Sequence, residues 1–231
     1  MGTIFAVFFM TEQNTFRFPT ILLIFITYFS GYLYTKYQYT RHFLKILALN
    51  VAAGVICAFL IIHNHNEVRL LKWFVIVVLG LLYNSFFLHV YIRKIPLLKV
   101  FYVGLVWALV NCWLTLPEFS LSIFLISFFF ITALVLPFDI RDMKSDTVET
   151  FPRMIGVQNT KYIAYVLVFI SVILAIFNLK LIYGVAFFLT GIITFILIYF
   201  SENKRDDTYF SFWIETCSAL PFLFLLIMEY F

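Results

Sequence analysis

An all-α bundle of membrane-spanning helices is predicted for this chain on three observations. Of its 231 residues, 64% are hydrophobic and only 12% are charged, whereas a soluble domain carries about 25% charged residues. Its mean hydropathy is +1.01, so its polar groups cannot cover its surface and lipid is the expected solvent. Phe is abundant at 31 residues while Gly and Pro are few at 8 and 6. This composition favours spanning helices over a β-barrel, whose strands alternate and need many turn residues.

The apolar runs between charged residues predict eight spans, because a bilayer core of roughly 30 Å needs about 20 helical residues. In chain order these are Phe18–Tyr34, Phe43–Ile62, Trp73–Tyr91, Val100–Leu114, Phe119–Phe138, Tyr162–Phe177, Leu181–Phe200 and Tyr209–Tyr230. The fourth and sixth runs are short, and their ends are poorly defined by the sequence. A ninth element, Met1–Met10, is only half a span, so residues 1–16 are expected to hold a shortened first helix or a segment lying at the interface. Residues 1–231 are therefore predicted to form one transmembrane domain of eight to nine spans.

The orientation of this bundle follows from its cations. If the spans alternate in direction, twelve of the 16 Lys and Arg residues fall on one side and four on the other. Cytoplasmic loops carry the excess of Lys and Arg, so the richer side is predicted to be cytoplasmic, in an inner (cytoplasmic) membrane. The net charge of +4 is attributed to this orientation, and no nucleic-acid partner is expected.

The longest charged connection on the predicted cytoplasmic side holds three carboxylates, Asp139, Asp142 and Asp146, spaced i, i+3, i+7. On a helix they fall within an arc of roughly 60°, with Arg141 and Lys144 expected to point elsewhere. Three like charges repel at the edge of a low-dielectric region, so a compensating cation is expected. Mg²⁺ prefers carboxylate oxygens and keeps positions open for phosphate. The stripe therefore predicts a Mg²⁺-held diphosphate with its lipid tail among the helices; solvated loop charges neutralised by Arg141 and Lys144 are the alternative.

Two stretches of the sequence resemble the UbiA family of intramembrane prenyltransferases. The stretch PFDIRDMKSDTVETFPRMIG is similar to the family's second Asp-rich motif, DxxDxxxD, followed by a Thr-x-Pro stretch and a Gly, which here are Thr150, Pro152 and Gly156. The stretch LLYNSFFLHVYIRKIPLLKVFYVGLVWA is similar to the connection around the family's fourth and fifth helices. The matching residues of this second stretch are Tyr83, Arg93, Lys94, Pro96, Lys99 and Trp107.

The resemblance implies a bundle of usually nine spans around a central cavity. It implies that a prenyl group moves from an isoprenyl diphosphate to a lipophilic, typically aromatic acceptor, with Mg²⁺ stabilising the leaving diphosphate. On this reading Asp139, Asp142 and Asp146 are the catalytic metal ligands. The residues expected to bind the diphosphate are Arg141, Lys144, Arg93, Lys94, Lys99, Tyr83, Lys36 and Arg41. Of these, at least one of the three cations at positions 93, 94 and 99 is expected to face the Asp-rich connection.

The family's first motif, NDxxDxxxD, has no counterpart. The corresponding stretch, Thr27–Arg41, contains no Asp, Glu or Asn. Its hydroxyls, with Lys36 and Arg41, could replace some of the metal charge directly, because such groups donate to phosphate oxygens. The other interpretation is a non-catalytic relative that binds lipid or acts as a membrane scaffold. The expected partners are therefore membrane lipid, an isoprenyl diphosphate and a lipophilic acceptor, and no protein partner is indicated.

Overall fold

The computed structural model describes residues 1–37, 40–83, 97–144 and 149–230, and over these residues every regular element is a helix. The helices in chain order are α1 (Gly2–Glu12), α2 (Phe18–Tyr37), α3 (Phe43–His63), α4 (Glu67–Tyr83), α6 (Leu98–Ala108), α7 (Leu121–Asp142), α8 (Phe151–Asn178), α9 (Leu181–Tyr199) and α10 (Leu220–Tyr230). Two π-helical turns, η1 (Leu109–Leu114) and η2 (Tyr209–Ile214), follow α6 and precede α10 respectively. The all-α class is confirmed for the described residues.

Five helices are long and apolar enough to cross a membrane, namely α2, α3, α7, α8 and α9. The predicted count of eight to nine spans is not confirmed. Helix α1 and the apolar helix Leu98–Leu114 are shorter than 18 residues, and half of the predicted span Trp73–Tyr91 lies outside the described residues. The five long apolar helices are compatible with an integral membrane protein.

Most predicted spans differ from the structure by a few residues at their ends, and two of them depart from it most. Helix α8 begins at Phe151, eleven residues before the predicted Tyr162, and its non-helical Gly156, with φ of 84°, marks a kink near its start. The predicted continuous span Tyr209–Tyr230 is broken at residues 217–219, where three successive amides bond three residues back along the chain. The last apolar segment is therefore two helical pieces joined by a tight turn.

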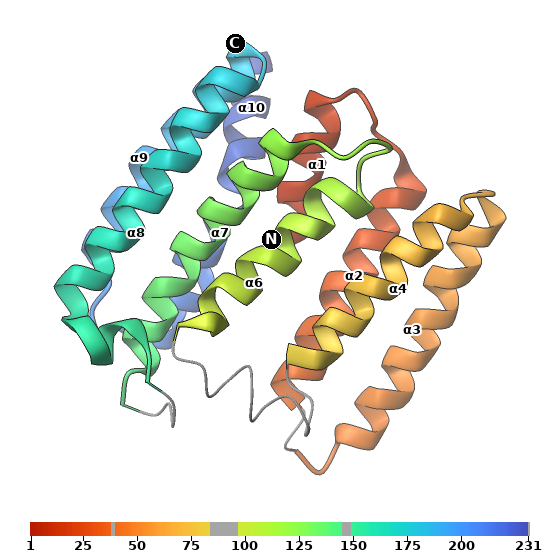
Figure 1. Cartoon of the computed structure of the whole chain (residues 1–231), viewed down its shortest axis with the longest axis horizontal. Helices are drawn as coiled ribbons and strands as arrows, with labels where there is room; N and C mark the ends of the chain where they lie inside the picture. The colour runs from red at the N-terminus through yellow and green to blue at the C-terminus, as the bar shows by residue number, and fades with distance from the viewer. Residues whose placement is uncertain (38–39, 84–96, 145–148, 231) are drawn as a thin grey trace.

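The helices run alternately between two ends of the bundle (Figure 1). The end of α2, the starts of α3 and α6 and the end of α7 lie toward the lower end of the view, while the α3–α4 connection lies at the upper end. Side chains tie each end together. At the upper end, Lys180 Nζ donates to the Glu12 carbonyl. At the lower end, Lys161 Nζ donates to the Tyr199 carbonyl at 2.7 Å.

The bundle is tightest where α7 packs between α6 and α8. Gly104 of α6 faces α7 so closely that a Cβ atom at this position would lie 2.2 Å from Thr132 Oγ1. Small residues at helix interfaces let membrane-embedded backbones approach each other in this way. This contact sets the separation of α6 and α7, the two helices that carry Lys99, Asp139, Arg141 and Asp142.

Helix α1 occupies the interior rather than the surface of the bundle. Its Phe5, Phe8 and Phe9 are fully buried, and Phe8 packs on Tyr183 and Phe187 of α9 with ring centroids 5.4 and 6.2 Å away. A helix that is apolar all round is a buried helix. Eleven helical residues reach only about 16 Å, so α1 fills one half of the bundle's length. Residues 1–16 thus hold a short buried helix, and its place relative to the membrane stays a prediction.

Candidate functional site

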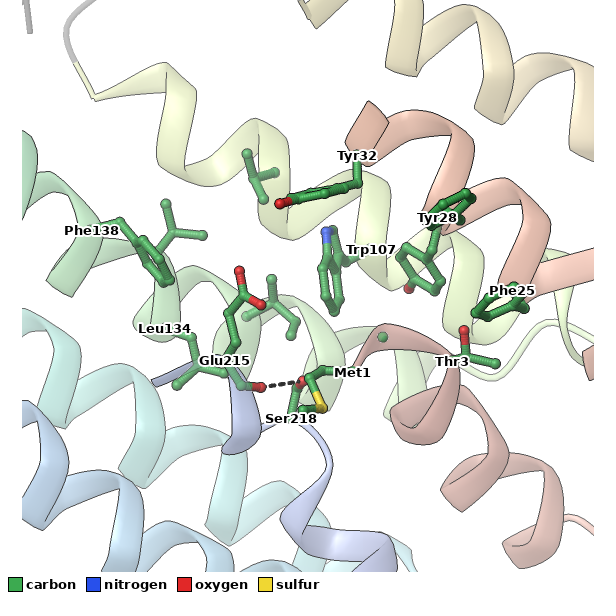
Figure 2. A pocket seen from close by; sticks show the side chains of 15 residues that line it. Met1, Thr3, Phe25, Tyr28, Tyr32, Trp107, Leu134, Phe138, Glu215 and Ser218 are labelled. Carbon is green, nitrogen blue, oxygen red and sulfur yellow. Dashed lines mark hydrogen bonds between the residues drawn. The ribbon is translucent and has the colours of Figure 1, made fainter. Parts of the chain in front are cut away.

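A cavity of about 420 Å³ lies in the half of the bundle that α1 does not fill. Its floor is the first turn of α1, and its walls come from α2, α6, α7 and the segment between η2 and α10 (Figure 2). The volume is within the range of about 300–1,000 Å³ typical of small-molecule sites.

Six of the 15 residues that line this cavity are aromatic. Helix α2 contributes Tyr28 and Tyr32, α6 contributes Trp107, and α7 contributes Phe138. The Tyr28 and Trp107 rings lie 4.7 Å apart between centroids. Ring faces of this kind attract cations and exclude water. Such walls suit an apolar chain and any positive charge that develops on it.

Helical register carries charged residues from the cavity walls to its rim. Residues four apart share one face of a helix. Asp139 and Asp142 each lie one turn beyond an α7 residue that lines the cavity, Val135 and Phe138 respectively. The same relation holds on the two facing helices. On α6, Lys99 lies one turn before the lining residue Val103, and on α2, Lys36 lies one turn beyond the lining residue Tyr32. The apolar cavity is therefore bordered at one end by charges of both signs.

Asp139 is the most deeply placed of these charges. It is 1% exposed, and its Oδ1 accepts a hydrogen bond from Lys99 Nζ at 3.1 Å. A buried carboxylate needs a partner, because its desolvation is otherwise very costly. Lys99 thus meets the expectation that at least one of the three cations between positions 93 and 99 faces the Asp-rich motif.

Asp142 forms a bidentate ion pair with its neighbour Arg141, at 2.7 and 2.9 Å. The expectation that Arg141 points away from the carboxylates is therefore wrong. Two planar groups that meet with paired bonds form a strong and geometrically specific contact. The guanidinium also lies over the Phe138 ring, 5.2 Å from its centroid, so Arg141 connects the charged rim to the cavity wall.

The other described candidates spread outward from the cavity. Lys36 Nζ donates to the Tyr32 hydroxyl at 2.7 Å, which keeps it at the rim. Tyr83 stacks on Tyr102 at 5.7 Å, in the contact between α4 and α6. Arg41 and Lys144 are exposed. Asp146, Arg93 and Lys94 lie outside the described residues, and their predicted roles stay predictions.

Asn203 is a rim residue that sequence reasoning missed. The stretch Glu202–Asp207 is predicted to be a solvated loop, but Asn203 Nδ2 donates to the carbonyls of Ile140 and Arg141, both at 3.0 Å. The last carbonyls of a helix lack partners within the helix, and here the amide supplies one. No local sequence pattern could have predicted this hydrogen bond, since the donor lies 63 residues from its acceptor.

A second feature is a buried polar chain beside the cavity, centred on Asn111, a buried amide that is expected from the sequence to bond across helices. The Tyr28 hydroxyl donates to Asn111 Oδ1 at 3.1 Å, and Asn111 Nδ2 donates to Ser127 Oγ at 3.3 Å. Asn111 and Ser127 are both fully buried. The chain joins α2, η1 and α7 across the bundle, and it fixes Tyr28 in the cavity wall. Its location in η1 agrees with the tendency of π-helical turns to occur at functional sites.

A Mg²⁺ site can be judged only from the carboxylates that the structure describes. No group of three or more His, Cys, Asp or Glu side chains among these residues is arranged to hold a metal ion. Mg²⁺ is often bound through one or two carboxylates plus substrate phosphates and water. Asp139 and Asp142, one turn apart on α7, meet that lower requirement in their donor chemistry.

Comparison of the chain with protein-family models, with curated proteins and with solved structures found no match. What this cavity does must therefore be argued from its own residues.

Proposed function

We propose that this chain is a membrane-embedded prenyltransferase of the UbiA type. In this proposal it moves a prenyl group from an isoprenyl diphosphate to a lipophilic acceptor. The apolar prenyl chain occupies the cavity, and the diphosphate lies at the charged rim. The proposal rests on the sequence resemblance and on one structural observation. On three helices, a charged residue lies one helical turn from a cavity-lining residue, and these charged residues are Asp139, Asp142, Lys99 and Lys36.

This arrangement matches the two ends of a prenyl diphosphate. A long apolar chain gains from aromatic and aliphatic walls, whereas a diphosphate needs positive charge and hydrogen-bond donors. Lys99, Arg141 and Lys36 supply that charge directly. Because their present partners are Asp139, Asp142 and Tyr32, a bound diphosphate would exchange these contacts for its own oxygens.

Mg²⁺ is part of the proposal. Asp139 and Asp142 would hold the ion, which supplies positive charge to the leaving diphosphate. The other roles in the proposal belong to the protein's own side chains. The walls formed by Trp107, Tyr28 and Phe138 orient the prenyl chain and exclude water from its reacting end.

The proposed setting is an inner membrane with the rim at the cytoplasmic face, where a water-soluble diphosphate head could enter. The described basic residues at the rim end, including Lys36, Lys99, Arg141 and Lys144, agree with the excess of positive charge expected on that side. The complete proposal adds the spans beyond the five long helices, with α4, Leu98–Leu114 and the η2–α10 segment as shorter crossings and α1 as the half-length ninth element.

Binding of diphosphates tests the proposal directly. The purified chain in lipid nanodiscs is mixed with radiolabelled geranyl, farnesyl, geranylgeranyl and octaprenyl diphosphates, with Mg²⁺ or with EDTA. We expect Mg²⁺-dependent binding of at least one chain length, weakened about tenfold or more by Asp139→Asn and Asp142→Asn, since losing support for a metal ion costs 10–100-fold. Asp206→Asn, an exposed carboxylate in the α9–η2 connection, is the matched control. Absence of binding to every chain length would remove the proposal.

A non-catalytic lipid-binding or scaffold protein is the second candidate, and the ion pairs favour it. Both described carboxylates of the motif already have a protein cation as partner, and the stretch Thr27–Arg41 supplies no further carboxylate. This candidate predicts that the two Asn variants leave lipid binding and any cellular phenotype unchanged. Release of diphosphate during incubation with a prenyl diphosphate and an extract of membrane lipids would decide for the enzyme.

A further inference from the structure

The inner part of the cavity contains a carboxylate that the Asp-rich motif does not explain. Glu215 lies directly after η2, and its side chain points into the space between Phe138 and Trp107 (Figure 2). It is the one charged side chain among the 15 residues that line the cavity. Ionisable groups within a membrane-embedded bundle are costly and usually functional.

The backbone around Glu215 departs from a regular helix. The π-helical turn η2 ends at Ile214, and the amides of residues 217–219 then form a tight turn before α10. Ser218, which also lines the cavity, donates its hydroxyl to the Glu215 carbonyl at 2.8 Å. Irregular backbone at membrane depth is tolerated where it lines a cavity. The break thus presents Glu215 and Ser218 to the hollow rather than to lipid.

The chemistry of this position favours one kind of ligand group. An ionised carboxylate only accepts hydrogen bonds, so the group bound there must be a donor. Glu215 already interacts electrostatically with the amino group of Met1 and, less strongly, with the side chains of Arg141 and Lys36, which lessens the need for a cationic ligand. A ligand carboxylate would face the like charge of Glu215 inside apolar walls, where repulsion is strong. An uncharged hydroxyl on an apolar body donates a hydrogen bond, adds no further positive charge and is not repelled by Glu215.

We infer that Glu215 binds the hydroxyl of an uncharged lipophilic acceptor, a phenol or long-chain alcohol, and excludes carboxylated acceptors. The inference rests on the proposed function, because it assigns the acceptor's place in the same cavity. Glu215 and Ser218 then hold the polar end of the acceptor, and its apolar body lies between Trp107 and Phe138 beside the reacting end of the prenyl chain. The diphosphate keeps the separate rim at Asp139 and Asp142.

Three probes that share an octyl-substituted benzene ring and differ in the group opposite the octyl chain test the inference without any diphosphate or Mg²⁺. They are 4-octylphenol, octylbenzene and 4-octylbenzoate, titrated into the chain in nanodiscs while tryptophan fluorescence and the midpoint of thermal unfolding are recorded. We expect 4-octylphenol to bind about tenfold more tightly than the other two. Glu215→Gln should weaken octylphenol binding about tenfold, since hydrogen bonds to ionised groups are roughly twice as strong as neutral ones. The same substitution should strengthen octylbenzoate binding by a similar factor.

Because the affinities for octylphenol and octylbenzoate should change in opposite directions, the test separates a binding role of Glu215 from a structural one. Glu202→Gln, the same change in the exposed connection after α9, should alter neither affinity. Val103→Phe, which narrows the cavity, should weaken all three probes together. Equal binding of the three probes by the unaltered chain, or an equal change for all three in Glu215→Gln, would overturn the inference.

Failure of the proposed function would look different. Asp142→Asn should bind octylphenol like the unaltered chain, because the rim is not part of the acceptor position. Loss of all diphosphate binding with octylphenol selectivity intact would leave Glu215 as a hydroxyl-binding site in a protein that is not a prenyltransferase. Intact diphosphate binding without octylphenol selectivity would overturn only the role of Glu215.

Discussion

The two halves of the bundle interior differ in what fills them. At one end, Phe5 and Phe8 of α1 pack against Phe130 and Phe187 in a core without exposure to solvent. At the other end, walls of similar composition surround a cavity of about 420 Å³. Hydrophobic composition therefore does not decide which half is hollow. The aromatic rings of α1 fill one half, and the first turn of α1 forms the floor of the cavity in the other.

The largest effect is expected from emptying the packed half. Phe8→Ala should lower the free energy of unfolding by about 3–5 kcal/mol, since truncating a buried Phe leaves an unfilled cavity. Phe25→Ala, at a cavity-lining position that is 52% exposed, should cost less than about 1 kcal/mol. Both values can be measured by unfolding in mixed micelles. Similar losses for the two variants would contradict the contrast between a packed and a hollow half.

A smaller effect is expected from pushing the two walls of the cavity apart. Gly104→Ala would place a Cβ atom against Thr132 of α7, and overpacking of this kind costs about 1–3 kcal/mol. Gly31→Ala in α2 is the matched control, because no atom lies within 4 Å of its added Cβ. The control should be neutral or stabilising by up to about 1 kcal/mol, following the higher helix propensity of Ala. A stabilised Gly104→Ala would show that α6 and α7 are not in close contact.

A still smaller effect is expected from breaking the hydrogen-bonded chain of Tyr28, Asn111 and Ser127, which lies at the boundary of the two halves. Asn111→Leu removes the bonds to Tyr28 and Ser127 and should cost about 1 kcal/mol, as interhelical hydrogen bonds in membranes do. Asn159→Leu, whose amide bonds only within its own helix, should change stability by less than about 0.5 kcal/mol. A double-mutant cycle of Asn111→Leu with Ser127→Ala measures the coupling directly, and strict additivity would refute the network.

Sequence patterns were most informative where lipid imposes the helix. The predicted spans Phe43–Ile62 and Leu181–Phe200 differ from α3 and α9 by one residue at one end, because an apolar run in a bilayer must satisfy its backbone within itself. The turn before α10 was missed, although Pro221 in the first turn of α10 was an available sign of a helix start. The early start of α8 was also missed, although the Pro at its second position was a similar sign of a helix start.

The candidate site could be predicted only in part. The charged residues of the rim were identified because their types and spacing are local properties. Their pairing was not, since Lys99 and Asp139 meet across 40 residues of chain, and Arg141 turned toward Asp142. The hollow itself depends on how segments distant in the sequence pack around it, since its lining residues run from Met1 to Ser218. Glu215 was visible as a carboxylate in an apolar run, but its direction depends on a backbone break that the apolar pattern does not reveal.

The smallest expected effect concerns the connection that closes the end of α7. Asn203→Ala removes an amide that bonds two helix-end carbonyls at 3.0 Å, and a neutral bond of this kind contributes about 0.5–1.5 kcal/mol. Asp207→Asn changes the same connection, but Asp207 is 88% exposed and 3.8 Å from Arg141. Such a solvated pair should contribute less than about 0.5 kcal/mol, and less still at high salt. Because Asn203 anchors the turn that bears Asp139 and Asp142, its loss should also weaken diphosphate binding, whereas Asp207→Asn should leave that binding intact. If Asp207→Asn weakened binding more than Asn203→Ala, exposed charge rather than the fixed end of α7 would govern the mouth of the hollow half.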